Sequence, residues 1–275
     1  MSKYYLHDKK IKYPNNSFEH MIKAEKYHDY KYTESFPYRL SSFKDKFIRF
    51  IFKIGFIFLV QPVCAIRYAL KFKGLKNIRK YRKMAKSNAL LSVCNHTTEW
   101  DTIMIMTSRY FIFPEFPIWQ EGAESKAGMT YRYAGGLVLP YNSLRGTVYS
   151  YKAMKDVLEE GKWLHVFPEA ACWAFYPCIR EFKEGTFFLA YDTHLPVLPM
   201  VIKYRPAKGI YKLFKKYPCA TLIIGEPLEC DFSLSRKEAA EDLKNRTHLS
   251  MVKLIGFDSE EENSEAIKEI YEKQN

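Results

Sequence analysis

Short apolar runs alternate with amphipathic stretches from residue 88 to the C-terminal end of the sequence. Apolar runs bounded by polar or turn residues predict buried strands, and apolar residues at every third or fourth position predict helices. The predicted strands are 89–93, 117–120, 137–139, 163–167, 197–203 and 220–224. The predicted helices are 102–110, 145–160, 185–193, 235–254 and 260–273. This alternation predicts an α/β fold class.

The N-terminal third has a different pattern. Asn16 followed by Glu19 is typical of a capping box and predicts a helix over residues 16–34. Between residues 43 and 70 the longest uninterrupted apolar run is only seven residues, whereas a membrane-spanning helix needs roughly 20 predominantly apolar residues. We therefore predict two short helices, broken near Pro62, that lie at a membrane interface. A pair of helices packed in the protein core is the alternative.

Positive charge is concentrated in this N-terminal third. Residues 1–88 carry 21 Lys and Arg against 6 Asp and Glu, whereas the remainder carries 22 against 25. Near an anionic leaflet each basic side chain contributes about 1 kcal/mol. The basic run adjoins an aliphatic segment rather than aromatic side chains interleaved with Arg, which argues against nucleic acid. We predict an anionic membrane surface as a partner and no nucleic acid; a solvated basic face is the alternative.

The sequence predicts two parts. Residues 1–75 form basic and aromatic membrane-associating helices, and residues 76–275 form the α/β domain. The first ten residues lack the apolar core of a cleavable signal peptide. The six cysteines show no C-x-x-C spacing, and several lie in apolar runs, where reduced, buried cysteine is usual. These features predict a monotopic or peripheral protein on the cytoplasmic face of a membrane.

A polar loop after the strand 89–93 carries a candidate catalytic pair. Residues five apart on a regular helix point about 140° away from each other, so His96 and Asp101 meet only if His96 lies in the loop. Asp101 then orients the imidazole and leaves one ring nitrogen free to take a proton from an alcohol, which typically contributes about 10² to 10⁴ in rate. We interpret the residues between them as variable spacers. A loop histidine beside a helix-capping aspartate is the plainer interpretation of this spacing alone.

A second loop carries candidate binding groups. The strand 163–167 ends in Pro168 and Glu169, which puts a carboxylate at a rigid strand exit. Arg180 and Lys183 follow and bring anion-binding groups close in sequence to this carboxylate. The alternative is a simple β-turn with an exposed glutamate.

Taken in order, these segments resemble the glycerolipid acyltransferase family typified by bacterial 1-acyl-glycerol-3-phosphate acyltransferase (the PlsC type). Its first block, N-H-x-x-x-x-D, is similar to Asn95, His96 and Asp101. Its third block, F-P-E-G, is similar to residues 167–170, with Ala170 in place of Gly. The segments "IREFKEGTFFLAYDTHLPVLPMVI" and "LIIGEPLE" also resemble family segments. The resemblance covers about residues 88–255.

The resemblance implies a fold, a chemistry and partners. It implies a mixed central sheet flanked by helices, preceded by a membrane-interfacial helix pair. It also implies transfer of a fatty acyl group from acyl-CoA or acyl-ACP (acyl carrier protein) to a hydroxyl of a lysophospholipid or related glycerolipid. Foremost among these acceptors is 1-acyl-glycerol-3-phosphate, giving phosphatidic acid, with no acyl-enzyme, no metal ion and no cofactor. His96, oriented by Asp101, is the implied general base, and Phe167, Pro168 and Glu169 are implied to hold the acceptor.

The sequence departs from the family pattern at two places. The second family block commonly ends with an Arg that binds the acceptor phosphate, and "GGLVLPYN" carries no basic residue there. Arg145, which opens the next predicted helix, or Arg180 or Lys183 is the expected substitute, since a helix N-terminus favours phosphate. Ala170 replaces a glycine, and because Ala disfavours a left-handed backbone, we expect either a different turn or a negative φ.

Other interpretations stay open at this point. A non-catalytic membrane-binding homologue fits the altered second and third blocks, and an acyltransferase with a non-phosphate acceptor fits the missing Arg. A metal-dependent hydrolase would use His96, Glu99, Asp101 and His165 as ligands. Cys94 is a candidate nucleophile, although burial at the strand end is the simpler interpretation.

Overall fold

A mixed five-stranded sheet forms the centre of the computed structural model, which describes residues 4–8, 10–21, 25–109, 111–209, 211–214 and 216–274. Its strands lie in the order β1 (Lys71–Lys73), β7 (Cys219–Ile224), β6 (Val197–Arg205), β2 (Leu90–Cys94) and β5 (Trp163–Val166). Only β6 and β7 pair antiparallel, and the other neighbours run parallel. The α/β class with a mixed central sheet is confirmed.

A two-stranded parallel sheet of β3 (Phe116–Trp119) and β4 (Gly136–Leu139) extends this arrangement. Glu115, just before β3, joins it to β5: its N–H donates to the Trp163 carbonyl at 2.7 Å, and its carbonyl accepts from His165 N at 2.8 Å. All six predicted strands are present with small shifts at their ends. The sequence did not predict β1, because its Lys-Phe-Lys contains no apolar run.

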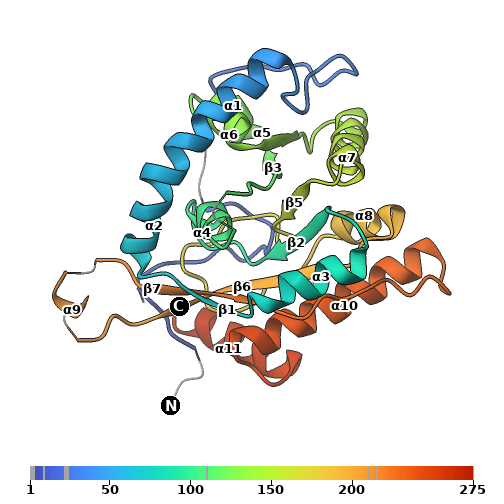
Figure 1. Cartoon of the computed structure of the whole chain (residues 1–275). Helices are drawn as coiled ribbons and strands as arrows, with labels where there is room; N and C mark the ends of the chain where they lie inside the picture. Colours follow the sequence, from blue (N-terminus) through green and yellow to red (C-terminus); the bar gives the residue numbers. More distant parts are fainter. Residues whose placement is uncertain are drawn as a thin grey trace.

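Helices cover both faces of the sheet (Figure 1). They are α1 (Phe43–Gly55), α2 (Gln61–Tyr68), α3 (Lys76–Ala85), α4 (Asp101–Thr107), α5 (Gln120–Glu124), α6 (Gly128–Ala134), α7 (Leu144–Glu159), α8 (Gly185–Thr193), α9 (Tyr211–Phe214), α10 (Arg236–Ile255) and α11 (Glu260–Glu272), with a π-helical turn, η1 (Phe56–Val60), between α1 and α2. The five predicted helices from residue 102 onward correspond to α4, α7, α8, α10 and α11.

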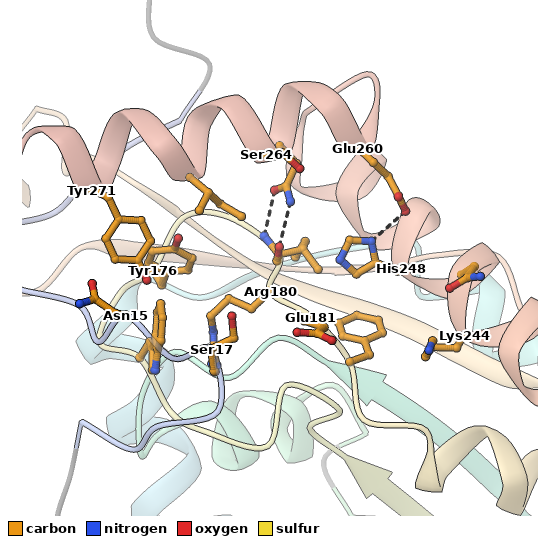
Figure 2. Close-up of a pocket in the computed structure, with 16 residues that line it drawn as sticks. Asn15, Ser17, Tyr176, Arg180, Glu181, Lys244, His248, Glu260, Ser264 and Tyr271 are labelled. Carbon is orange, nitrogen blue, oxygen red and sulfur yellow. Dashed lines mark hydrogen bonds and ion pairs between the residues drawn. The ribbon is translucent and has the colours of Figure 1, made fainter.

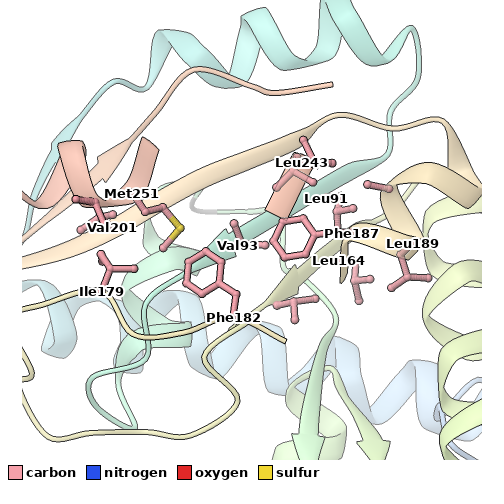
Figure 3. Packing of buried hydrophobic residues seen from close by; sticks show 14 of the residues in the cluster. Leu91, Val93, Leu164, Ile179, Phe182, Phe187, Leu189, Val201, Leu243 and Met251 are labelled. Carbon is pink, nitrogen blue, oxygen red and sulfur yellow. The ribbon is translucent and has the colours of Figure 1, made fainter. Parts of the chain in front are cut away.

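Alternate residues of the central strands pack into two apolar clusters. Leu91 and Val93 of β2 face a cluster shared with α8 and α10 (Figure 3). Leu90 and Cys94 face the other cluster, which includes residues of α2, α3 and α4. Because successive side chains of a strand point to opposite faces, β2 is buried on both sides. The sheet is therefore a rigid base for the loops at its strand ends.

The apolar N-terminal segment is one helix, so the predicted break near Pro62 is wrong. Phe43–Tyr68 is continuous over 26 residues and, by length and composition alone, is long and apolar enough to cross a membrane. Proline breaks a regular helix because its ring clashes with the carbonyl four residues earlier. Here the Gln61 N–H bonds to the Phe56 carbonyl, five residues back. This wider π-helical turn precedes Pro62 and keeps the helix continuous.

The predicted helix 16–34 is also wrong for the part that the structure describes, since residues 16–21 and 25–34 contain no helix. The Asn16 side chain accepts from the Phe18 N–H at 3.0 Å, and its carbonyl accepts from Glu19 N at 3.0 Å. The cap-like residues therefore close a single turn. Asn side chains bond to the nearby backbone in turns as well as at helix starts.

Candidate active site

His96 and Asp101 meet at the carboxyl end of β2. His96 lies in the loop after the strand, and Asp101 is the first residue of α4. The His96 Nδ1 atom lies 2.9 Å from Asp101 Oδ2. Asp101 is fully buried, whereas the His96 side chain keeps 19 % of its surface exposed. One ring nitrogen is thus held by a buried carboxylate, and the ring still reaches solvent.

Thr97 and Thr98 hold the Asp101 carboxylate, so the interpretation of the intervening residues as spacers is wrong for these two. The Thr97 and Thr98 hydroxyls donate to Asp101 Oδ1 at 3.1 and 2.8 Å. Both backbone N–H groups donate to Oδ2, the one from Thr98 at 2.9 Å. Together these four donors fix the position of the carboxylate, which fixes in turn where His96 points. Thr at two successive positions before a helix-initial Asp is the sequence signal for this cage.

The His96 ring lies between an aromatic wall and a thiol. Phe167 stacks on it, with ring centroids 4.1 Å apart and planes 12° apart. Burial lowers the pKa of His96, but the neighbouring Cys172 and Asp101 outweigh burial and raise it above its ordinary value. The sequence analysis did not identify Cys172, although it lies three residues beyond the F-P-E block.

His165, the second histidine at this edge, is a structural residue. It is fully buried in β5, and its Nδ1 lies 2.8 Å from the Ser92 hydroxyl. Burial and the nearby His96 lower the pKa of His165 to about 3, so it is neutral across the physiological range. Among the residues that the structure describes, no group of three or more His, Cys, Asp or Glu side chains is arranged to hold a metal ion.

Glu169 is buried beside the His96 loop and is fully engaged. Its Oε2 accepts from the His96 backbone N–H at 3.0 Å and from Arg180 Nη2 at 2.8 Å. Its Oε1 accepts from the Arg180 backbone N–H at 2.9 Å. Both side chains are at most 2 % exposed. The alternative of an exposed glutamate in a simple turn does not fit this burial, and Glu169 links the F-P-E turn to the His96 loop.

The turn after Glu169 requires a left-handed residue, and Ala170 supplies it with φ of 60°. The expectation of a different turn or a negative φ is therefore wrong. An L-residue with a Cβ pays about 1–2 kcal/mol for this conformation. The backbone accepts that cost because Ala170 N bonds to the Phe167 carbonyl and Ala171 N bonds to the Glu169 carbonyl.

The remaining predicted site residues fall into two groups. Pro168 is buried, and its carbonyl accepts from the Lys183 backbone N–H at 2.8 Å. The Lys183 side chain is exposed, and its ammonium lies 3.4 Å from the Phe18 ring centroid. Arg145 is exposed on the first turn of α7 and makes no ion pair with this cluster within the described ranges. The structure therefore brings Phe167 and Glu169 into contact with His96, and Arg180 into contact with Glu169. Pro168 and Lys183 belong to the adjoining loop, and Arg145 lies outside the cluster.

A pocket of about 580 Å³ with a mixed polar and apolar lining lies beside Arg180, between the segment 173–182, α10 and α11 (Figure 2). Two of its buried donors, Tyr176 Oη and Arg180 Nε, have no hydrogen-bond partner among the residues that the structure describes. His248 on α10 contacts Glu260 on α11 across the pocket at 2.9 Å. A buried donor without a partner favours an acceptor group from outside the chain.

Residues 69–203 match a family model described as Acyltransferase. This range runs from just before β1 into β6, and it includes His96, Asp101, Glu169 and Arg180. No curated protein sequence matches the chain. Among solved structures, the chain is similar to the 1-acyl-sn-glycerophosphate (LPA) acyltransferase PlsC from Thermotoga maritima. That match has 20 % identity and a TM-score of 0.47, and it covers 76 % of this chain and 83 % of that one.

Proposed function

The chain is an enzyme of the acyltransferase family through its residues 69–203, and on that premise we propose that it acylates a glycerolipid hydroxyl with His96 as the general base. The observation that carries this proposal is the Nδ1–Oδ2 hydrogen bond of 2.9 Å between His96 and the buried Asp101. The bond fixes the tautomer in which Nδ1 carries the proton. The other ring nitrogen then holds the lone pair that accepts a proton.

The proposed reaction is a direct transfer. His96 removes the proton from the acceptor hydroxyl as its oxygen attacks the carbonyl of an acyl thioester, acyl-CoA or acyl-ACP. The new C–O bond forms, the tetrahedral oxyanion collapses, and the C–S bond breaks. The leaving thiolate takes the proton back from His96, so the histidine returns to its neutral form. Every atom is accounted for without a metal ion or a cofactor.

On the acceptor side we propose a lysophospholipid, foremost 1-acyl-glycerol-3-phosphate with phosphatidic acid as the product. Phe167 stacks on the His96 ring, which supports a substrate contact for Phe167 and for Pro168 next to it in the sequence. Arg180 and Lys183 are the proposed cations for the acceptor's negative charge, since Arg180 Nε is a buried donor without a partner. We propose that Glu169 acts through Arg180 and the His96 backbone.

We propose that the protein lies on a membrane surface through the helix Phe43–Tyr68. One side of this helix contacts the domain along its length: Arg49 meets Glu115, Phe52 meets Tyr133 and Tyr68 meets Trp100. Nine apolar side chains at helical spacing are exposed instead. They are Phe43, Phe47, Phe50, Ile51, Ile54, Phe58, Leu59, Val63 and Ile66.

Such an apolar stripe on a docked helix favours an interfacial rather than a spanning position. We therefore propose a monotopic or peripheral protein. The cytoplasmic face is proposed because all six cysteines are free, as is usual in a reducing compartment.

The function is tested with purified protein, a labelled acyl-CoA or acyl-ACP and a panel of lysolipid acceptors, both phosphate-bearing and phosphate-free. We expect labelled product from at least one lysophospholipid. His96→Ala is expected to lower the transfer rate by about 10² to 10⁴, whereas His28→Ala, far in sequence from the site, is the matched control. Wild-type transfer by His96→Ala would contradict the proposed base. No transfer to any lysolipid would contradict the proposed acceptor class.

A further inference from the structure

A second pocket, of about 600 Å³, lies at the opposite end of the strands from His96. Its lining includes Asn88, Glu115 and Lys162, which closely precede β2, β3 and β5. These strands run in the same direction, so the pocket lies at their amino ends. His96 and Glu169 follow the carboxyl ends of β2 and β5. The pocket is therefore separate from the proposed catalytic site.

Basic side chains dominate this pocket. Six of them line it against a single carboxylate, and they are Lys46, Arg49, Lys53, Arg82, Arg109 and Lys162. The carboxylate of Glu115 is already neutralised, since Arg39 Nε lies 2.7 Å and Arg49 Nη1 3.4 Å from its oxygens. The pocket therefore has a large excess of positive charge.

Four of these cations have no counter-ion within the part of the chain that the structure describes. They are Lys46, Lys53, Arg82 and Arg109, which make no ion pair with a carboxylate there. Burial and, after it, the neighbouring Arg82 lower the pKa of Arg109 to about 10. Like charges held together without an anion repel each other, and a bound anion removes this cost.

The pocket also has an apolar border. Phe50, Phe111 and Ile112 line it and are 59, 75 and 43 % exposed. Phe50 belongs to the apolar stripe of the helix Phe43–Tyr68, and α1 supplies Lys46, Arg49 and Lys53 from the adjoining turns. Charge inside and exposed apolar groups beside it suit an amphiphile with an anionic head group better than a soluble anion.

We propose that this pocket binds the phosphate head group of an anionic phospholipid whose acyl chains lie against Phe50, Phe111 and Ile112. Guanidinium and ammonium groups are the usual protein ligands of phosphate. This site rests on the proposed membrane location but not on the proposed chemistry. The proposed lipid site attaches the protein to an anionic leaflet near the amino ends of the strands, away from His96.

The test uses vesicles of phosphatidylcholine alone and of phosphatidylcholine mixed with phosphatidylglycerol, which is neither substrate nor product of the proposed reaction. The full chain is compared with a triple variant, Lys53→Gln, Arg82→Gln and Arg109→Gln, by co-sedimentation. The matched control, Lys76→Gln, Arg79→Gln and Lys83→Gln, removes the same charge from exposed positions on α3. Acyl transfer in detergent micelles is measured for all three proteins.

We expect the pocket variant to bind the phosphatidylglycerol vesicles at least about tenfold more weakly, and the control variant to lose clearly less. Equal losses in the two variants would mean a diffuse basic surface and would overturn the pocket. Thermal unfolding is also measured with inorganic phosphate and with short-chain phosphatidylglycerol. If both raise the thermal midpoint equally, the pocket binds a soluble anion, and the proposal of a lipid ligand is wrong. If the triple variant fails to fold, Arg82→Gln alone, an exposed position, is expected to show the same direction.

Unchanged transfer in micelles by the pocket variant is part of the expected result. If the wild-type protein shows no transfer activity but the pocket variant still loses vesicle binding, only the proposed function is contradicted. A protein with full transfer activity whose pocket variant binds vesicles like the wild type would contradict only the lipid site.

Discussion

Hydrogen bonds of single polar side chains decide where His96 points. Asn95, next to it, bonds to Ile202 on β6 with both ends of its amide, accepting from N at 2.8 Å and donating to the carbonyl at 3.2 Å. Thr97 and Thr98 hold Asp101, and the Thr97 hydroxyl also lies 2.8 Å from the Tyr204 hydroxyl. Three neighbours of the histidine thus hold it in position, as the proposed base requires, because a base must be held within a few tenths of an ångström of its substrate.

Ala170→Gly is expected to stabilise the protein. Ala170 is exposed with φ of 60°, so glycine relieves left-handed strain without loss of packing. After the greater flexibility of glycine in the unfolded chain is subtracted, we expect a gain of about 0.5–1 kcal/mol in the free energy of unfolding. Ala127→Gly is the control. Ala127 is exposed with φ of −83°, so this substitution is expected to lower the free energy of unfolding. Urea unfolding of both variants measures the difference, and a loss for Ala170→Gly would contradict the strain.

Cys172→Ala is expected to move the pH dependence of transfer to lower pH. The titratable groups that interact electrostatically with His96 are Asp101, Cys172, His20 and His165. Cys172 raises the pKa of His96, so its removal lowers that pKa. Since a general base works in its neutral form, the acidic limb of kcat/KM against pH then lies at lower pH.

Cys178→Ala, a buried thiol of the same loop, is the control for that experiment and is expected to leave the limb in place. An unshifted limb in Cys172→Ala would mean that the thiol does not act on His96. A rate lost at every pH would instead show that the thiol is needed for the reaction itself.

At the scale of elements, the helix Phe43–Tyr68 combines two surfaces. Its buried positions, Gln61, Cys64 and Tyr68, contact the domain near α4 and β7. Its exposed apolar positions recur every three to four residues, which is one face of a helix. The length of the longest apolar run did not reveal this face. Charged residues such as Lys53 end the run in the sequence, but they lie on a different side of the helix from the apolar stripe.

Replacing Phe47 and Phe58 by Ser is expected to weaken binding to phosphatidylcholine vesicles. Each side chain is mostly exposed, and each loses about 1.5–3 kcal/mol of transfer free energy if it is fully buried in the interface. Co-sedimentation is therefore expected to fall at least about tenfold, with the thermal midpoint unchanged. Leu144→Ser and Leu213→Ser, exposed residues of α7 and α9, are the control pair. Equal binding by both pairs would mean that this stripe is not the membrane contact.

At the scale of the whole molecule, the Glu169–Arg180 pair joins distant parts of the chain. Glu169 accepts from the His96 backbone, and Arg180 donates to the carbonyls of Ser17 and Ala171. The N-terminal segment, the His96 loop and the F-P-E turn therefore meet at one buried ion pair. Such a pair is costly to break from one side, because the remaining charge stays buried without a partner.

Glu169→Gln is expected to lower the free energy of unfolding by about 3–5 kcal/mol, since it leaves the Arg180 charge buried. Asp192→Asn is the matched control: its pair with Arg236 is partly exposed at 2.6 Å, so its loss is expected to stay within about 1 kcal/mol. Chemical denaturation measures both. Equal losses would mean that the buried pair has no special role in holding the loops together.

The alternation of apolar runs determined most of the fold, since strands such as 163–167 and helices such as 185–193 have patterns that only burial explains. The residue types and spacing of Asn95, His96 and Asp101 identified the candidate base before any contact was known. Only the tertiary structure decided what lies around it: Cys172 and Phe167 against the ring, Glu169 on its backbone and Arg145 outside the cluster. Local sequence determines periodicity and turn chemistry. Which loops meet, and which cations are left without a counter-ion, depends on strand order and on helices packing across the sheet.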